Sequence, residues 1–212
     1  MDANDVEVVA RKTLYQGYFR LDQYIFRHKL FEGGWGEAIS REVLERGHAA
    51  CCLLFDPDLD ELVFIEQFRP GAYAALQSPW YDREKDSPWQ IEVVAGVIDE
   101  NETPEDLVRR EAMEESGCQV HELELISQYL VTSGCSSETQ MLYCGRVDAR
   151  TASGIHGLAH EGENIRVFRT PTAEAFKMLA DGTFNNATVL LAMYWFQQNH
   201  PRLRRQWSSD GK

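Results

Sequence analysis

Two glycines bracket an acidic segment that constrains the fold more than any other part of the chain. Residues 95–118 read AGVIDENETPEDLVRREAMEESGC. Thr103 offers an N-cap hydroxyl, Pro104 suits the first helical position, and Gly117 can take the left-handed conformation that ends many helices. The sequence therefore predicts a helix over residues 103–116, preceded by a glycine-containing loop.

This predicted helix has an unusual concentration of negative charge. Glu111, Glu114 and Glu115 lie within two turns, and Glu111 and Glu115 fall on one face at the i, i+4 spacing. Like charges at that spacing repel each other unless a cation lies between them. Carboxylate oxygens, completed by water and substrate phosphate, are ligands that Mg²⁺ takes in proteins. A solvated acidic face is the alternative interpretation, since most charged runs are of that kind.

The spacing of these charges resembles the Nudix box, G-x5-E-x7-R-E-U-x-E-E-x-G-U, where U is an apolar residue. All the fixed positions match, and a chance match in a chain of this size has a frequency on the order of one in a million. Ala112 and Cys118 occupy the apolar positions, and the fixed positions are Gly96, Glu102, Arg110, Glu111, Glu114, Glu115 and Gly117. The resemblance implies a hydrolase that splits diphosphate bonds with a divalent metal.

Charge and composition limit the classes of protein to which the chain can belong. The formal net charge of -13 argues against binding to nucleic acid or to an anionic membrane. No apolar run approaches membrane-spanning length and the N-terminus has no signal-peptide core, so we expect a cytoplasmic protein. The 212 residues, 43% of them hydrophobic, suffice for one core and a smaller appendage. The five cysteines form no C-x-x-C pair and are interpreted as buried free thiols, not a zinc site.

Hydrophobic patterning predicts a mixed α+β fold. Residues 6–31 have room for two or three strands, and further strands are expected in HAACCLLFDP, ELVFIEQFRP, QIEVVAG, ELELISQYLVTSG, TQMLYCGRVD and ENIRVFR. Besides the acidic helix, PTAEAFKMLADG and NNATVLLAMYWFQQ are predicted to be helical, the first begun by Pro171. Long loops are expected at residues 71–89, which contain the tripeptide SPW twice, and at residues 149–164.

Several stretches outside the box are similar to the ADP-ribose pyrophosphatase branch of the Nudix family, among them LYQGYF, REVLERGHAA, TSGCSSE and TASGIHGLAHEGENIRV. The resemblance implies an α+β fold in which a Nudix α/β/α sandwich has an additional N-terminal antiparallel β-sheet. It places that sheet at residues 1–46, for dimerisation and substrate contacts, the Nudix domain at 47–200 and a C-terminal tail at 201–212. It also implies a homodimer whose partner reaches into the substrate pocket.

The same resemblance assigns the metal ligands and the general base. The ligands are expected to be Glu111, Glu115, the main-chain carbonyl of Ala95, and Glu163 in the loop EGEN. Glu161 in that loop is expected to deprotonate the attacking water. An exchange of roles between Glu161 and Glu163 stays open, as does an ordinary charged loop if the resemblance is set aside.

Arg110 and Glu114 are expected to support catalysis from within the box. Arg110 would pair with a neighbouring carboxylate and aim Glu111 and Glu115, as groups behind metal ligands do. Glu102 and Glu114 receive a similar, mostly structural interpretation.

Four further residues are expected to bind the nucleotide substrate. The resemblance makes Tyr18 an aromatic stacking residue, Arg41 and Arg69 cationic contacts, and Glu138 a contact to the terminal ribose hydroxyls. The alternatives are a core aromatic at Tyr18 and plain surface charge at the two arginines.

Together these features predict a Mg²⁺-dependent enzyme, with Mn²⁺ able to substitute, that hydrolyses ADP-ribose to AMP and ribose 5-phosphate. Another nucleoside diphosphate sugar or dinucleotide (ADP-glucose, GDP-mannose or NADH) is an alternative substrate, because the chain between Arg69 and the glycine loop is longer than usual in the branch. A non-catalytic domain that senses ADP-ribose and a structural dimer with an acidic helix are the alternatives from other classes. No nucleic acid or membrane partner is expected.

Overall fold

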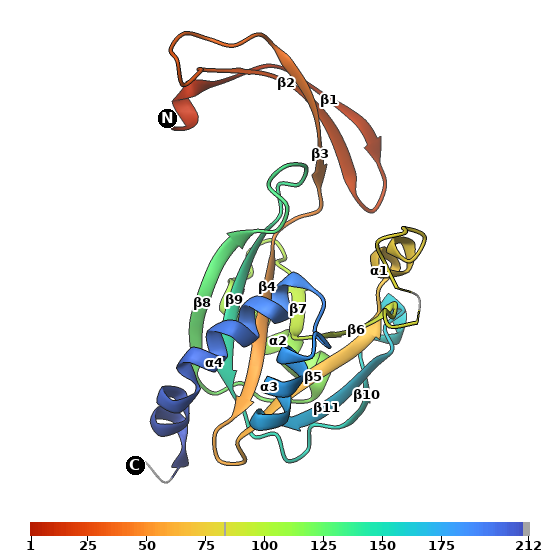
Figure 1. Ribbon diagram of the computed structural model, residues 1–212, viewed down its shortest axis with the longest axis vertical. Coiled ribbons are helices and arrows are strands. Elements are labelled where there is room, and N and C mark those ends of the chain that lie inside the picture. Colours follow the sequence, from red (N-terminus) through yellow and green to blue (C-terminus); the bar gives the residue numbers. More distant parts are fainter. Residues whose placement is uncertain (83, 210–212) are drawn as a thin grey trace. The chain divides into compact units, whose positions relative to one another are not determined.

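The computed structural model describes residues 1–82 and 84–209 (Figure 1). Residues 1–48 and 129–140 form one compact unit, and residues 49–128 with those from 141 onward form the other. The first unit contains a three-stranded antiparallel sheet. The second contains most of a larger sheet that has helices on both faces. The predicted α+β class with an additional N-terminal antiparallel sheet is confirmed.

The N-terminal sheet has the strand order β1-β2-β3. Its elements are the short 3-10 turn η1 (Ala3–Asp5) and the strands β1 (Val6–Gln16), β2 (Arg20–His28) and β3 (Ile39–Glu45). Every residue of β1 is exposed, including Val6 and Val8, so this strand adds nothing to a core.

A fully buried carboxylate, Asp22, lies in the middle strand of this sheet. It accepts hydrogen bonds from Nε and Nη2 of Arg11 at 3.0 and 2.5 Å, from Oγ1 of Thr13 at 2.7 Å and from Nε of Arg20 at 2.9 Å. These donors, Arg11 foremost, lower the pKa of Asp22 to about 2. The chain itself therefore neutralises this charge.

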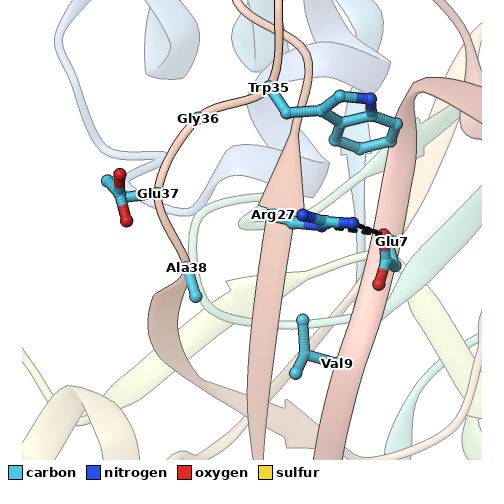
Figure 2. A pocket seen from close by; sticks show the side chains of 7 residues that line it. All are labelled: Glu7, Val9, Arg27, Trp35, Gly36, Glu37 and Ala38. Carbon is cyan, nitrogen blue, oxygen red and sulfur yellow. Dashed lines mark hydrogen bonds and ion pairs between the residues drawn. The ribbon is translucent and has the colours of Figure 1, made fainter.

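An open hollow lies on the same sheet (Figure 2). Inside it the Arg27 guanidinium pairs with Glu7 at 2.7 Å and lies 5.2 Å from the ring centre of Trp35. The lining residues are Glu7, Val9, Arg27, Trp35, Gly36, Glu37 and Ala38. The residues predicted to catalyse or to bind substrate are not among them.

The large sheet is built around a forked hairpin. Its strands are β4 (Ala49–Asp56), β5 (Glu61–Phe68), β6 (Trp89–Glu92), β7 (Val94–Val97), β8 (Leu123–Leu130), β9 (Thr139–Arg146), β10 (Gly154–His156) and β11 (Ile165–Pro171). β4 and β5 pair directly only near their connecting turn, where Asp56 is opposite Glu61, Phe55 opposite Leu62 and Leu54 opposite Val63. Beyond that point β6 pairs with β5 and β7 pairs with β4, so residues 89–97 fill the fork.

Helices cover both faces of the large sheet (Figure 1). They are α2 (Pro104–Ser116), α3 (Thr172–Ala180) and α4 (Ala187–Trp207). The short helix α1 (Pro70–Ala75) and the 3-10 turn η2 (Ala159–Glu161) lie in the connecting segments. Leu54 of β4 belongs to the core cluster that contains Leu107 of α2. The next residue, Phe55, points to the other face, where its ring centre lies 4.8 Å from that of Phe196 in α4. This layering is the predicted α/β/α sandwich.

Two segments differ from the predicted loops. Residues 71–89 begin inside α1, which Pro70 starts at its first position, and end in β6. The main-chain N–H of Arg69 donates to the carbonyl of Pro88 at 2.8 Å, so the two ends of this segment meet. Residues 149–164 contain β10 and η2, because β10 gains a partner in β11. Residue 83 of the first segment lies outside the described residues.

The last helix and one cysteine also differ from expectation. α4 continues to Trp207 through Pro201, although residues from 201 onward were predicted to be a tail. Leu203 and Trp207 are buried, and that packing favours the helix. Residues 210–212 of the predicted tail lie outside the described part of the chain. The cysteines of the described residues form no disulfide, and all except the exposed Cys135 are buried as predicted.

Membrane-spanning helices are not found in the described part of the chain, where no helix is both long and apolar enough to cross a bilayer.

Candidate active site

Helix α2 has the predicted caps. The hydroxyl of Thr103 accepts a hydrogen bond from the N–H of Asp106 at 3.2 Å, and Pro104 is the first helical residue. Gly117 ends the helix with a φ of 69°, in the left-handed region. The imidazole of His156 lies close by, because a Cβ on Gly117 would be only 3.0 Å from its Cε1. Local sequence signals thus fix both ends of the helix.

The two stacked carboxylates of α2 meet the backbone of β7. Glu115 is only 2% exposed, and its Oε2 accepts a hydrogen bond from the N–H of Ala95 at 2.9 Å. The carboxylate of Glu111 occupies the space into which a Cβ on Gly96 would project. The first glycine of the box is therefore needed so that this side chain can approach the strand.

The chain compensates the charge of this pair only in part, through Arg110 at Glu111 and Arg69 near Glu115. Burial raises the pKa of Glu111 to about 7, although Arg110 opposes the shift. Burial also raises the pKa of Glu115 to about 8, and repulsion from Glu111 and Glu163 adds to it. A divalent cation between the carboxylates would reverse both shifts, because it favours the ionised forms. The oxygen donors fit Mg²⁺, which keeps several waters and takes few carboxylates.

No three Asp, Glu, His or Cys side chains in the described ranges converge closely enough to hold an ion by themselves. An ion bound here would therefore need main-chain, water or substrate oxygens as well.

Arg110 joins the acidic residues of the box into one network. Its Nε and Nη2 donate to the two carboxylate oxygens of Glu102 at 3.0 and 3.1 Å. Its Nη1 donates to Oε1 of Glu111 at 2.8 Å and to Oε2 of Glu114 at 3.0 Å. These partners, Glu102 foremost, raise the pKa of Arg110. The predicted pairing with a neighbouring carboxylate is present, and it holds Glu111 in place.

The loop EGEN brings one of its two carboxylates toward α2. Oε2 of Glu163 accepts a hydrogen bond from the N–H of Leu158 at 2.9 Å, and its charge contributes to the raised pKa of both Glu111 and Glu115. Glu161, by contrast, is exposed and lies 3.5 Å from Nε2 of His160. The structure thus places Glu163 within electrostatic range of Glu111 and Glu115, and it leaves Glu161 exposed.

Arg69 lies in the same unit as these carboxylates and is not a solvated surface charge. It is half-buried, and its Nε and Nη2 donate to Oε2 of Glu92 at 2.9 and 2.7 Å. Burial alone would lower the pKa of Arg69, but Glu92, Glu115 and Glu163 raise it overall. Arg69 therefore lies in the electric field of two predicted metal ligands.

The other three predicted substrate residues belong to the N-terminal unit. Tyr18 lies between β1 and β2 and is 91% exposed, so it is not a core aromatic. Arg41 is exposed on β3, and its Nη1 donates to the carbonyl of Ser40 at 2.7 Å. Glu138 is 4% exposed and accepts hydrogen bonds from Arg46 at 2.7 Å and Gln140 at 3.1 Å.

Sequence reasoning missed two residues that hold predicted substrate contacts. Arg46 pairs with Glu138 across 92 positions, a separation at which no sequence pattern predicts contact. Glu92 pairs with Arg69 from the strand QIEVVAG, where it is the one charge in an otherwise apolar or uncharged run. That isolated charge was the signal available for Glu92.

Comparisons with known proteins agree with the geometry. The NUDIX domain family model matches residues 45–192. The chain is 45% identical over 205 residues to the ADP-ribose pyrophosphatase of Escherichia coli (strain K12), covering 97% of this chain and 94% of that protein. It is 35% identical over 203 residues to the ADP-ribose pyrophosphatase of Haemophilus influenzae, covering 96% and 91%.

A third relative has a different named substrate. The GDP-mannose pyrophosphatase of Yersinia pestis is 32% identical over 191 residues, covering 89% of this chain and 90% of that protein. All three relatives match nearly full length. With its capped acidic helix, its sandwich fold and a family match over most of its length, the chain belongs to the NUDIX domain family.

Proposed function

We propose that the protein is a Mg²⁺-dependent hydrolase that cleaves the diphosphate bond of ADP-ribose, yielding AMP and ribose 5-phosphate. The observation on which this rests is the carboxylate pair of Glu111 and Glu115, stacked on one face of α2 and held against Ala95 and Gly96 of β7. The two relatives of higher identity, both named ADP-ribose pyrophosphatase, support this choice of substrate.

The proposed metal site is formed by residues of α2, β7 and the loop EGEN. Glu111, Glu115, Glu163 and the carbonyl of Ala95 would hold Mg²⁺, with Mn²⁺ able to substitute. Bound there, the metal would offset charge on the phosphoryl oxygens and acidify the attacking water. Arg110 keeps Glu111 aimed at the site.

Glu161 is the proposed general base. Its carboxylate is exposed and lies 3.5 Å from Nε2 of His160, so water can reach it and give it a proton. In the alternative assignment Glu163 is the base and Glu161 the ligand. The field of Glu163 at Glu111 and Glu115 supports the first assignment.

Arg69, Tyr18, Arg41 and Glu138 are the proposed substrate contacts. Arg69 would bind the diphosphate, because its charge lies beside the metal ligands. Tyr18 offers an exposed ring for adenine, and Arg41 an exposed cation. Glu138 is proposed to accept hydrogen bonds from the terminal ribose, which requires it to share its carboxylate with Arg46.

We also propose a cytoplasmic homodimer. Residues 1–46 would form the dimerising region, residues 47–200 the catalytic domain and residues 201–212 its C-terminal end. The fully exposed β1, with Val6, Val8 and Val9 about half exposed, supports contact between two copies. Sedimentation velocity would test this, since a monomer at micromolar concentration would contradict it.

The test is turnover of ADP-ribose with Mg²⁺ by wild type and Glu111→Gln. We expect kcat to fall by about 100-fold or more in the variant, because a lost ligand weakens electrostatic stabilisation worth several kcal/mol. Glu105→Gln, an exposed carboxylate in the first turn of the same helix, is the matched control and should keep full activity. Equal, slow turnover by all three proteins would refute the proposal.

The relative named GDP-mannose pyrophosphatase supports a second candidate substrate class. Values of kcat/KM for ADP-ribose, ADP-glucose, GDP-mannose and NADH, measured side by side, would separate the candidates. Cleavage of ADP-ribose in ¹⁸O-labelled water would show in addition which product receives the label. A protein that binds ADP-ribose but never hydrolyses it would instead be a sensor.

A further inference from the structure

The side chains of Gln67 and Arg69 both contact that of Glu92 on the face of the large sheet that α2 covers. Glu92 of β6 is in register with Ile65 of β5, whose side chain lies in the core cluster beneath α2. Side chains alternate along a strand, so Gln67 lies on the same face as Ile65, and Arg69 follows directly after the strand. The fork thus brings Glu92 to Arg69 on the face of the sheet that carries the box.

Glu92 holds Arg69 through one edge of the guanidinium. Its Oε2 accepts from Nε at 2.9 Å and from Nη2 at 2.7 Å, while its Oε1 lies 3.2 Å from Nε. Gln67 donates to Oε2 of the same carboxylate at 3.2 Å. The Glu92 side chain is 17% exposed and Gln67 is 7% exposed, so the anchor is largely shielded from water.

The other edge of the guanidinium is unused. Nη1 of Arg69 donates no hydrogen bond to any residue in the described ranges. Its two N–H groups are therefore available to phosphoryl oxygens, which Arg binds in a forked geometry.

Arg69 also has competing partners nearby. Glu115 and Glu163 both attract it, and both are proposed metal ligands. Without an anchor, the long Arg69 side chain could turn to either carboxylate and occupy the place of the metal. An anchoring carboxylate outside the metal site prevents this.

We propose that Glu92 is a positioning residue that keeps the Arg69 guanidinium directed toward the substrate diphosphate and away from the metal-binding carboxylates. This inference rests on the proposed function. Glu92 touches neither metal nor substrate in this role, and Gln67 steadies it. Its removal should weaken substrate binding through Arg69 alone.

A double-mutant cycle with Glu92→Gln and Arg69→Ala tests the inference. We expect KM for ADP-ribose to rise roughly 10-fold in Glu92→Gln, the scale of effect seen for groups behind a functional side chain, with kcat changed less than threefold. The Mg²⁺ concentration for half-maximal rate should rise as well. The double variant should bind ADP-ribose no more weakly than Arg69→Ala, because Glu92 has no other route to the substrate.

Matched controls come from Glu66, the residue that precedes Gln67 in β5. Glu66 forms a comparable ion pair with Arg166 on the opposite face of the sheet, with Nε at 2.6 Å. Glu66→Gln and Arg166→Ala should leave KM unchanged. Glu92→Asp keeps the charge but shortens the reach, so its KM should lie between those of wild type and Glu92→Gln; it also serves if the glutamine variant folds poorly.

Calorimetric titration of ADP-ribose without metal separates this inference from the proposed function. Binding that weakens in Glu92→Gln, with the double variant binding no more weakly than Arg69→Ala, supports the anchor even if wild type shows no turnover. The anchoring role of Glu92 would be overturned if the two single losses of affinity multiplied in the double variant. It would also be overturned if Glu92→Gln bound ADP-ribose as tightly as wild type. Absence of both binding and turnover in wild type would overturn both proposals.

Discussion

Two buried carboxylates in this protein, Asp22 and Glu115, differ in how far the surrounding residues compensate their negative charge. Asp22, in the N-terminal sheet, accepts hydrogen bonds from Arg11, Thr13 and Arg20, and its pKa falls to about 2. Glu115, in the catalytic unit, accepts one backbone hydrogen bond, and its pKa rises to about 8. Burial alone therefore does not identify a functional carboxylate. The deciding observation is whether the surrounding chain supplies the opposite charge.

Replacing Glu115 should have the largest effect on activity. Glu115→Gln should lower kcat for ADP-ribose by about 100-fold or more, because a proposed metal ligand is lost. Its thermal midpoint without metal should not fall, since the variant removes repulsion and keeps an acceptor for the N–H of Ala95. Steady-state kinetics and calorimetry would check both. A destabilised variant with full activity would break the comparison with Asp22.

Adding Mg²⁺ should produce the next effect. At a Mg²⁺ concentration about 100 times its dissociation constant, the free energy of unfolding should rise by roughly 2.7 kcal/mol in wild type. Glu115→Gln should gain much less. Chemical denaturation with and without Mg²⁺, with Ca²⁺ as a second cation, would measure this. An equal gain in both proteins would place the cation elsewhere.

Loosening the network around Glu111 should have a smaller effect. Arg110→Lys should lower activity by roughly 10-fold, since lysine cannot bind Glu102, Glu111 and Glu114 at once. Arg150→Lys, in an exposed pair with Asp148, is the control and should be neutral. Unchanged kinetics in both variants would mean that Glu111 is aimed by its packing alone.

Lowering the pH should reveal the contribution of Asp22 to stability, and this is the smallest of the expected effects. The folded pKa of Asp22, about 2, lies below its unfolded value of 3.8, so its ion pairs stabilise the sheet above pH 3.8. That stability should be lost as the pH falls from 3.8 toward 2. Circular dichroism of wild type and Asp22→Asn over this range would test it, because the variant should lack this part of the pH dependence. Parallel curves would contradict the account.

Sequence alone predicted the features that depend on neighbours along the chain. Both caps of α2 follow from Thr103, Pro104 and Gly117, and the contacts of Arg110 within the helix follow from the spacing of box residues. Resemblance to the family added Glu163, which lies near the pair although it is distant in sequence. Local chemistry and family pattern thus predicted most of the residues around Glu111 and Glu115, whose metal-binding and catalytic roles stay predictions.

The features that were missed depend on tertiary pairing. Contact between Glu92 and Arg69 exists because β6 fills the fork at one register, and no local pattern specifies that register. The extension of α4 depends on burial of Leu203 and Trp207, which outweighs the tendency of Pro201 to end a helix. Propensity is a weak guide where packing decides.

The hydrogen bond between Arg69 and Pro88 has a practical consequence for engineering. Because it joins the two ends of the stretch between them, we expect the sheet to tolerate a change in the length of this branch of chain. A short glycine–serine connection, a fluorescent tag or a purification epitope could replace that branch while Arg69 keeps its place. The protein thus offers an attachment point within its catalytic unit that leaves both chain ends untouched.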